Sequence, residues 1–522
     1  ERTRTKDFYW QWDNMLKWNK TFGKHAFDFT FLANWEKFQR WHDEMTNENF
    51  LPTDELGYGG IGFGTSPNVS SDDVYRTGDA FMGRLHYVYD QRYLITATVR
   101  RDGYSAFGLA NPRATFPAIA LGWVFSEEKF LHRPDWFEYG KLRLSWGKNG
   151  NRAVGTYAAF MQLAPRKYIY VDPATGSLVT ANTFYASTMA NPNLKWESTT
   201  SWNIGTDLTF LKGRLSANLD VYKKITTDLL VSRELPSLIG YSSVMSNIGE
   251  VQNTGVELSL NSTNIRMDKL TWRTSFSLAY NKNKITHLYG IMEDVKDADG
   301  NVIGQREADD IKNKRFIGHD IDEIWDYKVV GIWQEEEREE AAKYGQQPGD
   351  VHLLDKDMNY KYDNTDKEFQ GTTMPRLRWS MRNDFTLFKN FNISFNMYSY
   401  IGHKKTLGRF TNDNALLNVT NQIKRDYWTP ENRNNEYPRL ANKKPAGVSY
   451  AIYKNASFLR FDNISIGYTF PKKLIEPLRI QNLNVNATMK NAGYISGWPG
   501  YDPENSDANT PRVIYFGINL TL

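Results

Sequence analysis

The feature that most constrains this chain is a regular alternation of apolar and polar residues. In FNISFNMY, residues 391–398, the odd positions carry Phe, Ile, Phe and Met, whereas the even positions carry Asn, Ser, Asn and Tyr. Successive side chains of a β-strand point to opposite faces of the sheet, so this run predicts a strand with one apolar face and one hydrogen-bonding face. A soluble sheet and a membrane barrel would both produce this pattern.

Similar runs recur along the chain and predict about fifteen strands. Many of them have about 10–15 residues, whereas strands of soluble sheets usually have about 5–6. The predicted strands cover residues 4–18, 26–40, 75–89, 93–106, 114–126, 138–149, 195–210, 214–230, 248–263, 270–288, 374–388, 391–404, 456–469, 481–493 and 512–522. The chain is therefore expected to be all-β.

The connections between these strands alternate in length. Short ones such as 22–24 and 211–214 alternate with long ones such as 150–194 and 289–373, and only 107–113 breaks the contrast. This sorting predicts a transmembrane antiparallel up-and-down β-barrel with long extracellular loops and short periplasmic turns. A closed barrel is also the only sheet that pairs every backbone group in hydrocarbon.

The odd strand count has a consequence for the ends of the chain. If the C-terminus is periplasmic, the first of fifteen strands begins at the outer surface, and the sheet keeps an open edge in lipid. We therefore expect residues 1–522 to be the C-terminal part of a larger barrel.

Composition and motifs exclude several function classes. The net charge of +4, without a basic cluster, argues against a nucleic-acid partner. The chain has no cysteine, which removes disulfides, thiol nucleophiles and cysteine-ligated zinc. The 8 histidines show no zinc-protease spacing, and the sequence contains neither a G-x-S-x-G elbow nor a phosphate-binding loop. We expect the chain not to be an enzyme.

Several stretches occur in a characteristic order. They include KLRLSWGKNGN (141–151), NPNLKWESTTSWNIGTDLTF (191–210), GEVQNTGVELSL (249–260) and NASFLRFDNISIGYTFP (455–471). In this order they resemble the SusC/RagA-type TonB-dependent transporters of the Bacteroidetes outer membrane, and the resemblance extends over essentially the whole chain.

The resemblance implies a plugged barrel of about 22 strands, so that roughly seven strands precede this chain, together with the plug and the TonB-contacting segment. It also implies import of an oligosaccharide or an oligopeptide across the outer membrane, driven through TonB. A SusD-like surface lipoprotein would act as a lid. No cofactor is required by this reading.

One loop predicts a metal site. In DKDMNYKYDNTD, residues 355–366, oxygen-bearing residues fall at the ligand positions of an EF-hand-type calcium loop, with Lys361 contributing its backbone carbonyl. The candidate ligands are Asp355, Asp357, Asn359, Lys361, Asp363 and Asp366. Tyr360 replaces the glycine of the sharp turn, and the last ligand is Asp rather than Glu. The alternative is a solvated acidic loop without an ion.

Cargo contact is predicted in two places. Aromatic rings in the outer loops suit sugar rings, or they serve as girdle and loop-packing residues. The candidates are Trp41, Tyr241, Trp325, Trp333 and Trp428. Polar residues on the inner parity should line the lumen and set its field, or form a ladder against the plug. They are Arg100, Asn203, Asp207, Asp220, Arg378, Arg382, Asp384, Asn396 and Asn486.

A second function remains open from the sequence. A secreted all-β glycan-binding or glycan-cleaving protein would bury its apolar parity in a dry core instead of lipid. In a membrane barrel, Lys, Asp and Glu should be absent from one parity across the middle ~25 Å of each strand. This distribution of charge separates the two interpretations.

Overall fold

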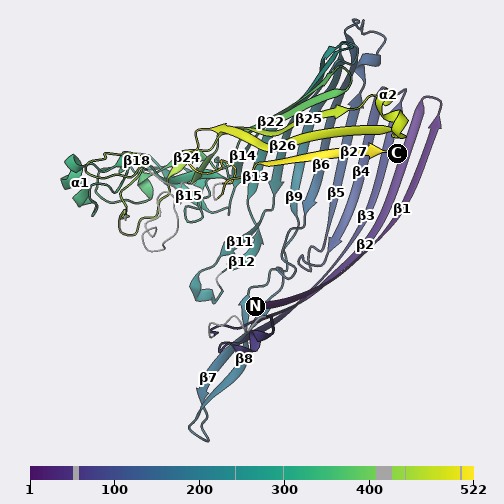
Figure 1. The fold of residues 1–522 in the computed structure, drawn as a ribbon. Helices are drawn as coiled ribbons and strands as arrows, with labels where there is room; N and C mark the ends of the chain where they lie inside the picture. The colour runs from purple at the N-terminus through teal and green to yellow at the C-terminus, as the bar shows by residue number, and fades with distance from the viewer. Residues whose placement is uncertain (51–57, 242, 298, 407–425, 441, 506–507) are drawn as a thin grey trace.

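A computed structural model describes residues 1–50, 58–241, 243–297, 299–406, 426–440, 442–505 and 508–522. Fifteen strands form one antiparallel sheet in which neighbours in space follow one another along the chain (Figure 1). They are β1 (Arg2–Phe22), β2 (His25–Thr46), β3 (Asn68–Tyr89), β4 (Tyr93–Tyr104), β5 (Arg113–Trp123), β6 (Phe137–Asn151), β9 (Glu197–Phe210), β10 (Leu215–Thr227), β13 (Glu250–Arg266), β14 (Leu270–His287), β21 (Leu377–Leu387), β22 (Phe391–Ile401), β25 (Phe458–Thr469), β26 (Asn482–Ser496) and β27 (Val513–Thr521).

The connections at one end of the sheet carry short elements of their own. The strand pairs are β7 (Gln162–Val171) with β8 (Leu178–Thr188), β11 (Leu230–Glu234) with β12 (Ser243–Asn247), β15 (Met292–Lys296) with β16 (Val302–Glu307), β17 (Glu323–Tyr327) with β20 (Lys367–Thr372), β18 (Val329–Ile332) with β19 (Val351–Leu353), and β23 (Lys404–Thr406) with β24 (Tyr453–Asn455). The helices and 3₁₀ turns at this end are α1 (Arg338–Lys343), η1 (Tyr58–Phe63), η3 (Ser237–Ile239), η4 (Glu335–Glu337) and η5 (Asn364–Asp366), and those at the opposite end are α2 (Lys472–Ile475), η2 (Phe125–Glu127) and η8 (Glu476–Leu478). No helix of the described residues is long and apolar enough to cross a membrane.

The predicted fold class is confirmed. Each of the fifteen predicted segments overlaps one strand of the sheet, and the contrast in connection length is present. Between β1 and β2 the turn has only Gly23 and Lys24, and the positive φ of Gly23, 55°, lets the chain reverse so tightly. The fifteen predicted segments do not include the six small strand pairs in the long connections.

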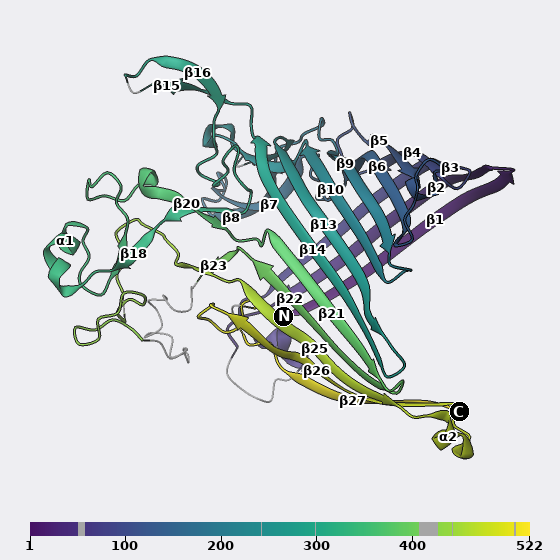
Figure 2. The same cartoon turned by 90° about the horizontal axis from the view of Figure 1, so that it is seen from above.

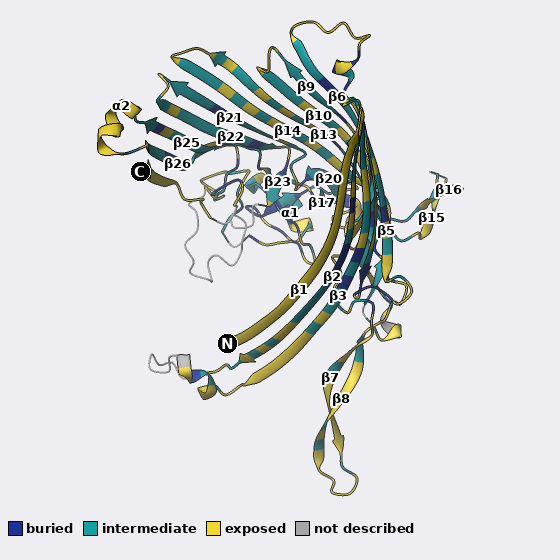
Figure 3. Ribbon diagram, turned by 90° about the vertical axis from the view of Figure 1, so that its right-hand side faces the viewer, coloured by how far each residue is buried: buried dark blue, intermediate teal, exposed yellow. Residues whose placement is uncertain are grey.

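The sheet is strongly curved, and its two outermost strands, β1 and β27, are not paired with each other (Figures 2 and 3). Each edge strand is hydrogen-bonded on one side only. The chain begins at the end of the long connections and reaches Thr521 at the end of the short turns. The described strands therefore form a trough rather than a closed barrel.

The convex face of the sheet is apolar and exposed. On β27, Ile514, Phe516, Ile518 and Leu520 share one parity and are 55, 81, 72 and 50% exposed. No second layer covers such rows in the described part of the chain (Figure 3). The convex parity of β9 and of β13 to β27 carries no Lys, Arg, Asp or Glu along its middle. A face of this kind is stable against lipid and not against water.

Aromatic rings gather on the convex face near the short turns. Trp272 of β14 stacks on Phe385 of β21 with ring centroids 5.4 Å apart, and Trp136 stacks on Phe210 at 6.0 Å. Aromatic side chains prefer the boundary between hydrocarbon and headgroups, so this row marks one membrane interface.

The long connections after β14, β22 and β26 pack together beyond the opposite end of the sheet. We call the described residues of 320–372 and 426–457, with Trp498, the loop lobe. Its core contains Ile332, Val351 and Leu353, each at most 2% exposed. The lobe is thus a small folded body with its own apolar interior.

Candidate functional site

The concave face carries a cavity of about 720 Å³. Its lining includes Gln11 of β1, Arg100 of β4 and Asn149 of β6. Four strands separate β1 from β6 in the sheet, so only the concave face can bring these side chains to one cavity. The residues of β4 that alternate in step with Arg100 therefore lie on the concave face.

Residues that lie opposite each other on neighbouring strands point to the same face, so the pairs identify the concave residues of each further strand. Arg100 lies opposite Phe116 on β5, and Ser145 of β6 lies opposite Asn203 of β9. Following the pairs to β26 places all nine predicted wall residues on the concave face. They are Arg100, Asn203, Asp207, Asp220, Arg378, Arg382, Asp384, Asn396 and Asn486.

Arg143 of β6 is the centre of one cluster on this wall. Its guanidinium donates to both Asp207 oxygens at 3.0 and 3.1 Å, and to the two Asp220 oxygens at 3.0 and 2.9 Å. Gly205 lies between them, where an added Cβ would come within 2.3 Å of Asp220 Oδ1. Sequence reasoning named the two carboxylates and missed Arg143. The apolar residues Leu142 and Leu144 on either side of it show the same alternation and place Arg143 on the polar face.

Other predicted wall cations have partners on their own strand or on the neighbouring one. Arg382 donates through Nη2 to Asp384 at 2.8 Å, and Arg100 donates through Nε to Asp102 at 2.9 Å. Arg378 lies over the ring of Tyr400, 5.2 Å from its centroid. Because each cation has a local partner, these residues form short ladders along the wall rather than one charged ring.

The two halves of the concave wall differ in chemistry. Strands β1 to β6 place charged side chains on it, and Arg152 beyond β6 pairs with Glu36 of β2 across the cavity. Strands β13 to β26 mostly present hydroxyls and amides, which bond one another, as between Thr488 and Ser465 at 2.8 Å. Most of the wall there is polar and wettable without fixed charge.

The five predicted aromatic platforms do not lie together. Trp325, Trp333 and Trp428 are 8, 1 and 4% exposed inside the loop lobe, so their rings cannot stack on a ligand in this conformation. This corrects the expectation for these three. Trp428 belongs to the apolar core of the lobe, and Trp333 stacks on His352 with ring centroids 3.5 Å apart. Trp41 lies on the convex parity opposite Lys6, and Tyr241 is half-buried beside η3.

The predicted calcium loop brings three of its carboxylates together. One oxygen each from Asp355, Asp357 and Asp366 lies within 4.8 Å of the others. Tyr360 has a φ of 63°, which is the left-handed turn that the usual glycine provides, and its N–H donates to Asp355 at 2.9 Å. Of the other candidates, Asn359 donates to Asp357, and Asp363 accepts from the Thr365 N–H at the start of η5.

The electrostatics of this loop are strained by like charges. Burial raises the pKa of Asp357, and the neighbouring Asp355 and Asp366 carboxylates raise it further. Burial also acts to raise the pKa of Asp355, but hydrogen bonds from Tyr344 and the Tyr360 N–H outweigh it and leave that pKa lowered. A cation between these carboxylates would relieve their repulsion.

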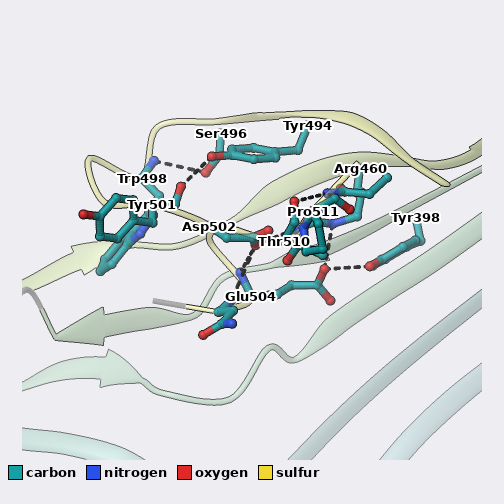
Figure 4. A network of polar contacts seen from close by, with 12 residues as sticks. Tyr398, Arg460, Tyr494, Ser496, Trp498, Tyr501, Asp502, Glu504, Thr510 and Pro511 are labelled. Atoms are coloured by element: carbon teal, nitrogen blue, oxygen red, sulfur yellow. Dashed lines mark hydrogen bonds and ion pairs between the residues drawn. The ribbon is translucent and has the colours of Figure 1, made fainter. Parts of the chain in front are cut away.

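A buried polar network ties the last long connection to the wall (Figure 4). Arg460 of β25 pairs with Asp502 through Nη2 and with Glu504 through Nε at 2.7 Å, and Tyr398 donates to Glu504 at 2.6 Å. Arg460 and Asp502 are 2 and 1% exposed. Burial acts to raise the pKa of Asp502, but hydrogen bonds from Thr510, the Glu504 N–H and Arg460 lower it, so the pair is held charged. The sequence analysis missed this network because its partners are far apart in the chain.

These features agree with comparisons to known proteins. The family model described as "TonB dependent receptor-like, beta-barrel" matches residues 1–492. The chain belongs to this family. Its β-barrels lie in the outer membrane, so the resemblance and the location inferred from the sequence are confirmed.

Two curated relatives give the scale of the likeness. TonB-dependent receptor SusC of Bacteroides thetaiotaomicron is 32% identical over 467 residues, which are 85% of this chain and 43% of that protein. TonB-dependent receptor P3 of Formosa agariphila is 28% identical over 508 residues, which are 95% of this chain and 49% of that protein. The chain therefore spans about half the length of the curated relatives it matches.

Among solved structures, the RagAB peptide transporter superposes with a TM-score of 0.76 at 21% identity. The match covers 99% of this chain and 56% of that one. It supports the barrel fold and, at this identity, nothing more specific.

Proposed function

We propose that this TonB-dependent receptor chain forms the C-terminal wall of an importer that carries a nutrient, an oligosaccharide or an oligopeptide, across the outer membrane. The observation that supports this most directly is the two-faced sheet. Its convex rows suit lipid, and its concave wall of Arg143, Asp207 and their neighbours suits a water-filled passage.

The rest of the importer would come from a part of the protein that precedes residue 1. It would supply roughly seven strands, the plug and the segment that contacts TonB. The unpaired edges at β1 and β27 support this, because an open sheet edge in lipid leaves backbone groups unsatisfied. The greater length of the relatives also supports it.

A SusD-like lipoprotein is the proposed partner at the outer end. The hairpin of β7 and β8 projects there with both faces uncovered (Figure 1). Leu163, Tyr168 and Phe184 on it are 61, 61 and 69% exposed, and an isolated apolar hairpin of this kind needs a partner.

The secreted glycan-binding or glycan-cleaving alternative is weaker. It requires a second layer over the apolar rows, and the described residues provide none. No catalytic constellation was predicted from the sequence, and the family is one of receptors and transporters. We therefore propose transport without catalysis.

Uptake in the native host tests the proposal. We expect deletion of the gene to abolish growth on one oligosaccharide or peptide source, and the full-length gene to restore it. Removal of TonB should give the same loss. Unchanged growth on every source, or recovery of the full-length protein in a detergent-free soluble fraction, would contradict the proposal.

A further inference from the structure

An apolar cavity of about 800 Å³ lies between two long connections at the mouth of the concave wall. One side comes from the connection between β10 and β13, through Leu229 and Ile248. The other comes from the connection after β14, through Ile321. The floor is the cross-strand pair Val251 and Ile285, which continues the concave parity of β13 and β14 and is 7 and 3% exposed.

The shape of this cavity is fixed by backbone hydrogen bonds. Ile248 N donates to Leu229 O at 2.9 Å, and Ile285 N donates to His319 O at 2.8 Å. Ile321 N donates to the side chain of Asn283 on the concave wall, also at 2.8 Å. The first bond closes one wall on itself, and the other two tie the connection after β14 to the end of that strand, so the cavity is formed before any ligand arrives.

The rim of the cavity carries one cation with spare donors. Arg315 donates through Nη1 to Ile321 O at 2.7 Å, and no other hydrogen bond of its guanidinium appears among the described residues. Lys312 pairs with Glu234, the one carboxylate of the described lining. Asp310 behind the rim accepts from Tyr289 at 2.6 Å. The remaining Arg315 donors can therefore take an anionic group of a ligand.

From this geometry we infer that the cavity binds an apolar side chain of an oligopeptide, with a carboxylate of the same peptide at Arg315. Sugar rings bind best on flat aromatic faces beside many polar groups, whereas the surface of this cavity is mostly apolar and eight of its 17 described lining residues are Leu, Ile or Val. An aliphatic side chain fills such a space and gains from leaving water. The inference rests on the proposed import function and narrows its cargo to peptides.

Binding of defined peptides to the purified full-length importer tests the apolar part. The probes are a Gly/Ser hexapeptide, the same peptide with a C-terminal Leu, and maltohexaose, measured by calorimetry. We expect the Leu peptide to bind about 10–200-fold more tightly than the Gly/Ser peptide, as hydrophobic pockets discriminate. Ile248→Glu should abolish this difference, because it places a charge against the cavity wall.

Leu238→Glu is the matched control. Leu238 lies in the same connection, is 99% exposed and does not line the cavity, so the preference for Leu should remain. Heat-modifiable gel mobility of both variants reports whether the barrel has formed.

The carboxylate part has its own test. We expect the Leu peptide with a free C-terminus to bind about tenfold more tightly than its C-terminal amide, since a charge-assisted pair with Arg315 is lost in the amide. Arg315→Gln should remove that preference. Lys314→Gln, an adjacent exposed cation outside the lining, should keep it.

Three results would overturn the inference. They are equal affinity for the Leu and Gly/Ser peptides, an Ile248→Glu variant that folds and still prefers Leu, and tight maltohexaose binding without peptide binding. The last result leaves the import proposal intact with a glycan cargo. A separate result, unchanged growth of the deletion strain on every nutrient, would contradict the import proposal itself.

Discussion

The sheet and the loop lobe use the same aromatic residues in opposite surroundings. In the lobe, Trp333 and Trp428 are 1 and 4% exposed. On the convex face of the sheet, Trp12 and Trp202 are 65 and 43% exposed. A chain that buries its tryptophans in one region and displays them in another is not in the same solvent in both regions. The lobe is built for water, and the convex face is built for lipid.

A charge introduced on the convex face should have the largest effect, because it would prevent assembly of the barrel. Leu258→Arg, in the middle of β13, should cost about 2–4 kcal/mol and prevent barrel assembly, because it places a cation near the bilayer midplane. Ser259→Arg, one residue further along on the exposed concave face, should assemble normally. Heat-modifiable gel mobility of the outer-membrane fraction measures this, and equal outcomes for the two variants would contradict the assignment of faces.

Calcium should stabilise the lobe. The three close carboxylates of the loop 355–366 predict that Ca²⁺ raises the free energy of unfolding by about 2.7 kcal/mol at a hundredfold excess over Kd. Asp357→Asn should remove this gain, and Asp135→Asn, an exposed acid elsewhere, should not. Thermal unfolding followed with Ca²⁺ and with chelator decides it. Unchanged melting would leave an acidic loop without an ion.

Substitution of Arg143 tests how much the charged cluster on the concave wall contributes to stability. Arg143→Met leaves Asp207 and Asp220 without their cation in a half-buried site, and should lower the unfolding free energy by about 1–2 kcal/mol. Arg382→Met is the control, since Arg382 and Asp384 are 56 and 41% exposed and such pairs contribute little. Denaturant midpoints should separate the two variants, and similar midpoints would count against the cluster.

A further prediction concerns acid stability at the base of the lobe. Burial lowers the pKa of His403 to about 4, with further lowering by Lys405 and Arg378. The unfolded chain takes up this proton near the ordinary pKa of 6.5, whereas the folded chain does not. Stability should therefore fall as the pH drops from about 6.5 towards 4. His403→Gln should flatten that part of the pH profile, and an unaltered slope would refute the assignment.

The strands of the sheet could be predicted because their pattern is local and repeated. Residues 391–398 contain enough alternation to define a strand and both of its faces, and the structure places them in β22. Every wall residue named from parity lies on the concave face for the same reason. Arg143 follows the same rule and could have been named as well, whereas Arg460 reaches the concave face only because a register shift between Phe461 and Asn463 reverses the alternation.

The lobe could not be predicted in this way. Trp428 lies in the core of the lobe and donates through Nε1 to Gln334, which is 94 residues away in the chain. Loop sequences carry no period, so an exposed platform and a buried core residue look alike. The Arg460–Asp502 pair and the apolar cavity likewise depend on tertiary packing.

The central claim is that the apolar rows face lipid, and residues 391–398 test it most directly. Residues 1–522 contain no cysteine, so a single cysteine introduced here can carry a spin label without background from this part of the protein. In full-length protein in bilayers, labels at odd positions should be accessible to oxygen, which concentrates in lipid, and labels at even positions should not. Odd positions shielded from oxygen would show a dry protein core behind the sheet and contradict the account.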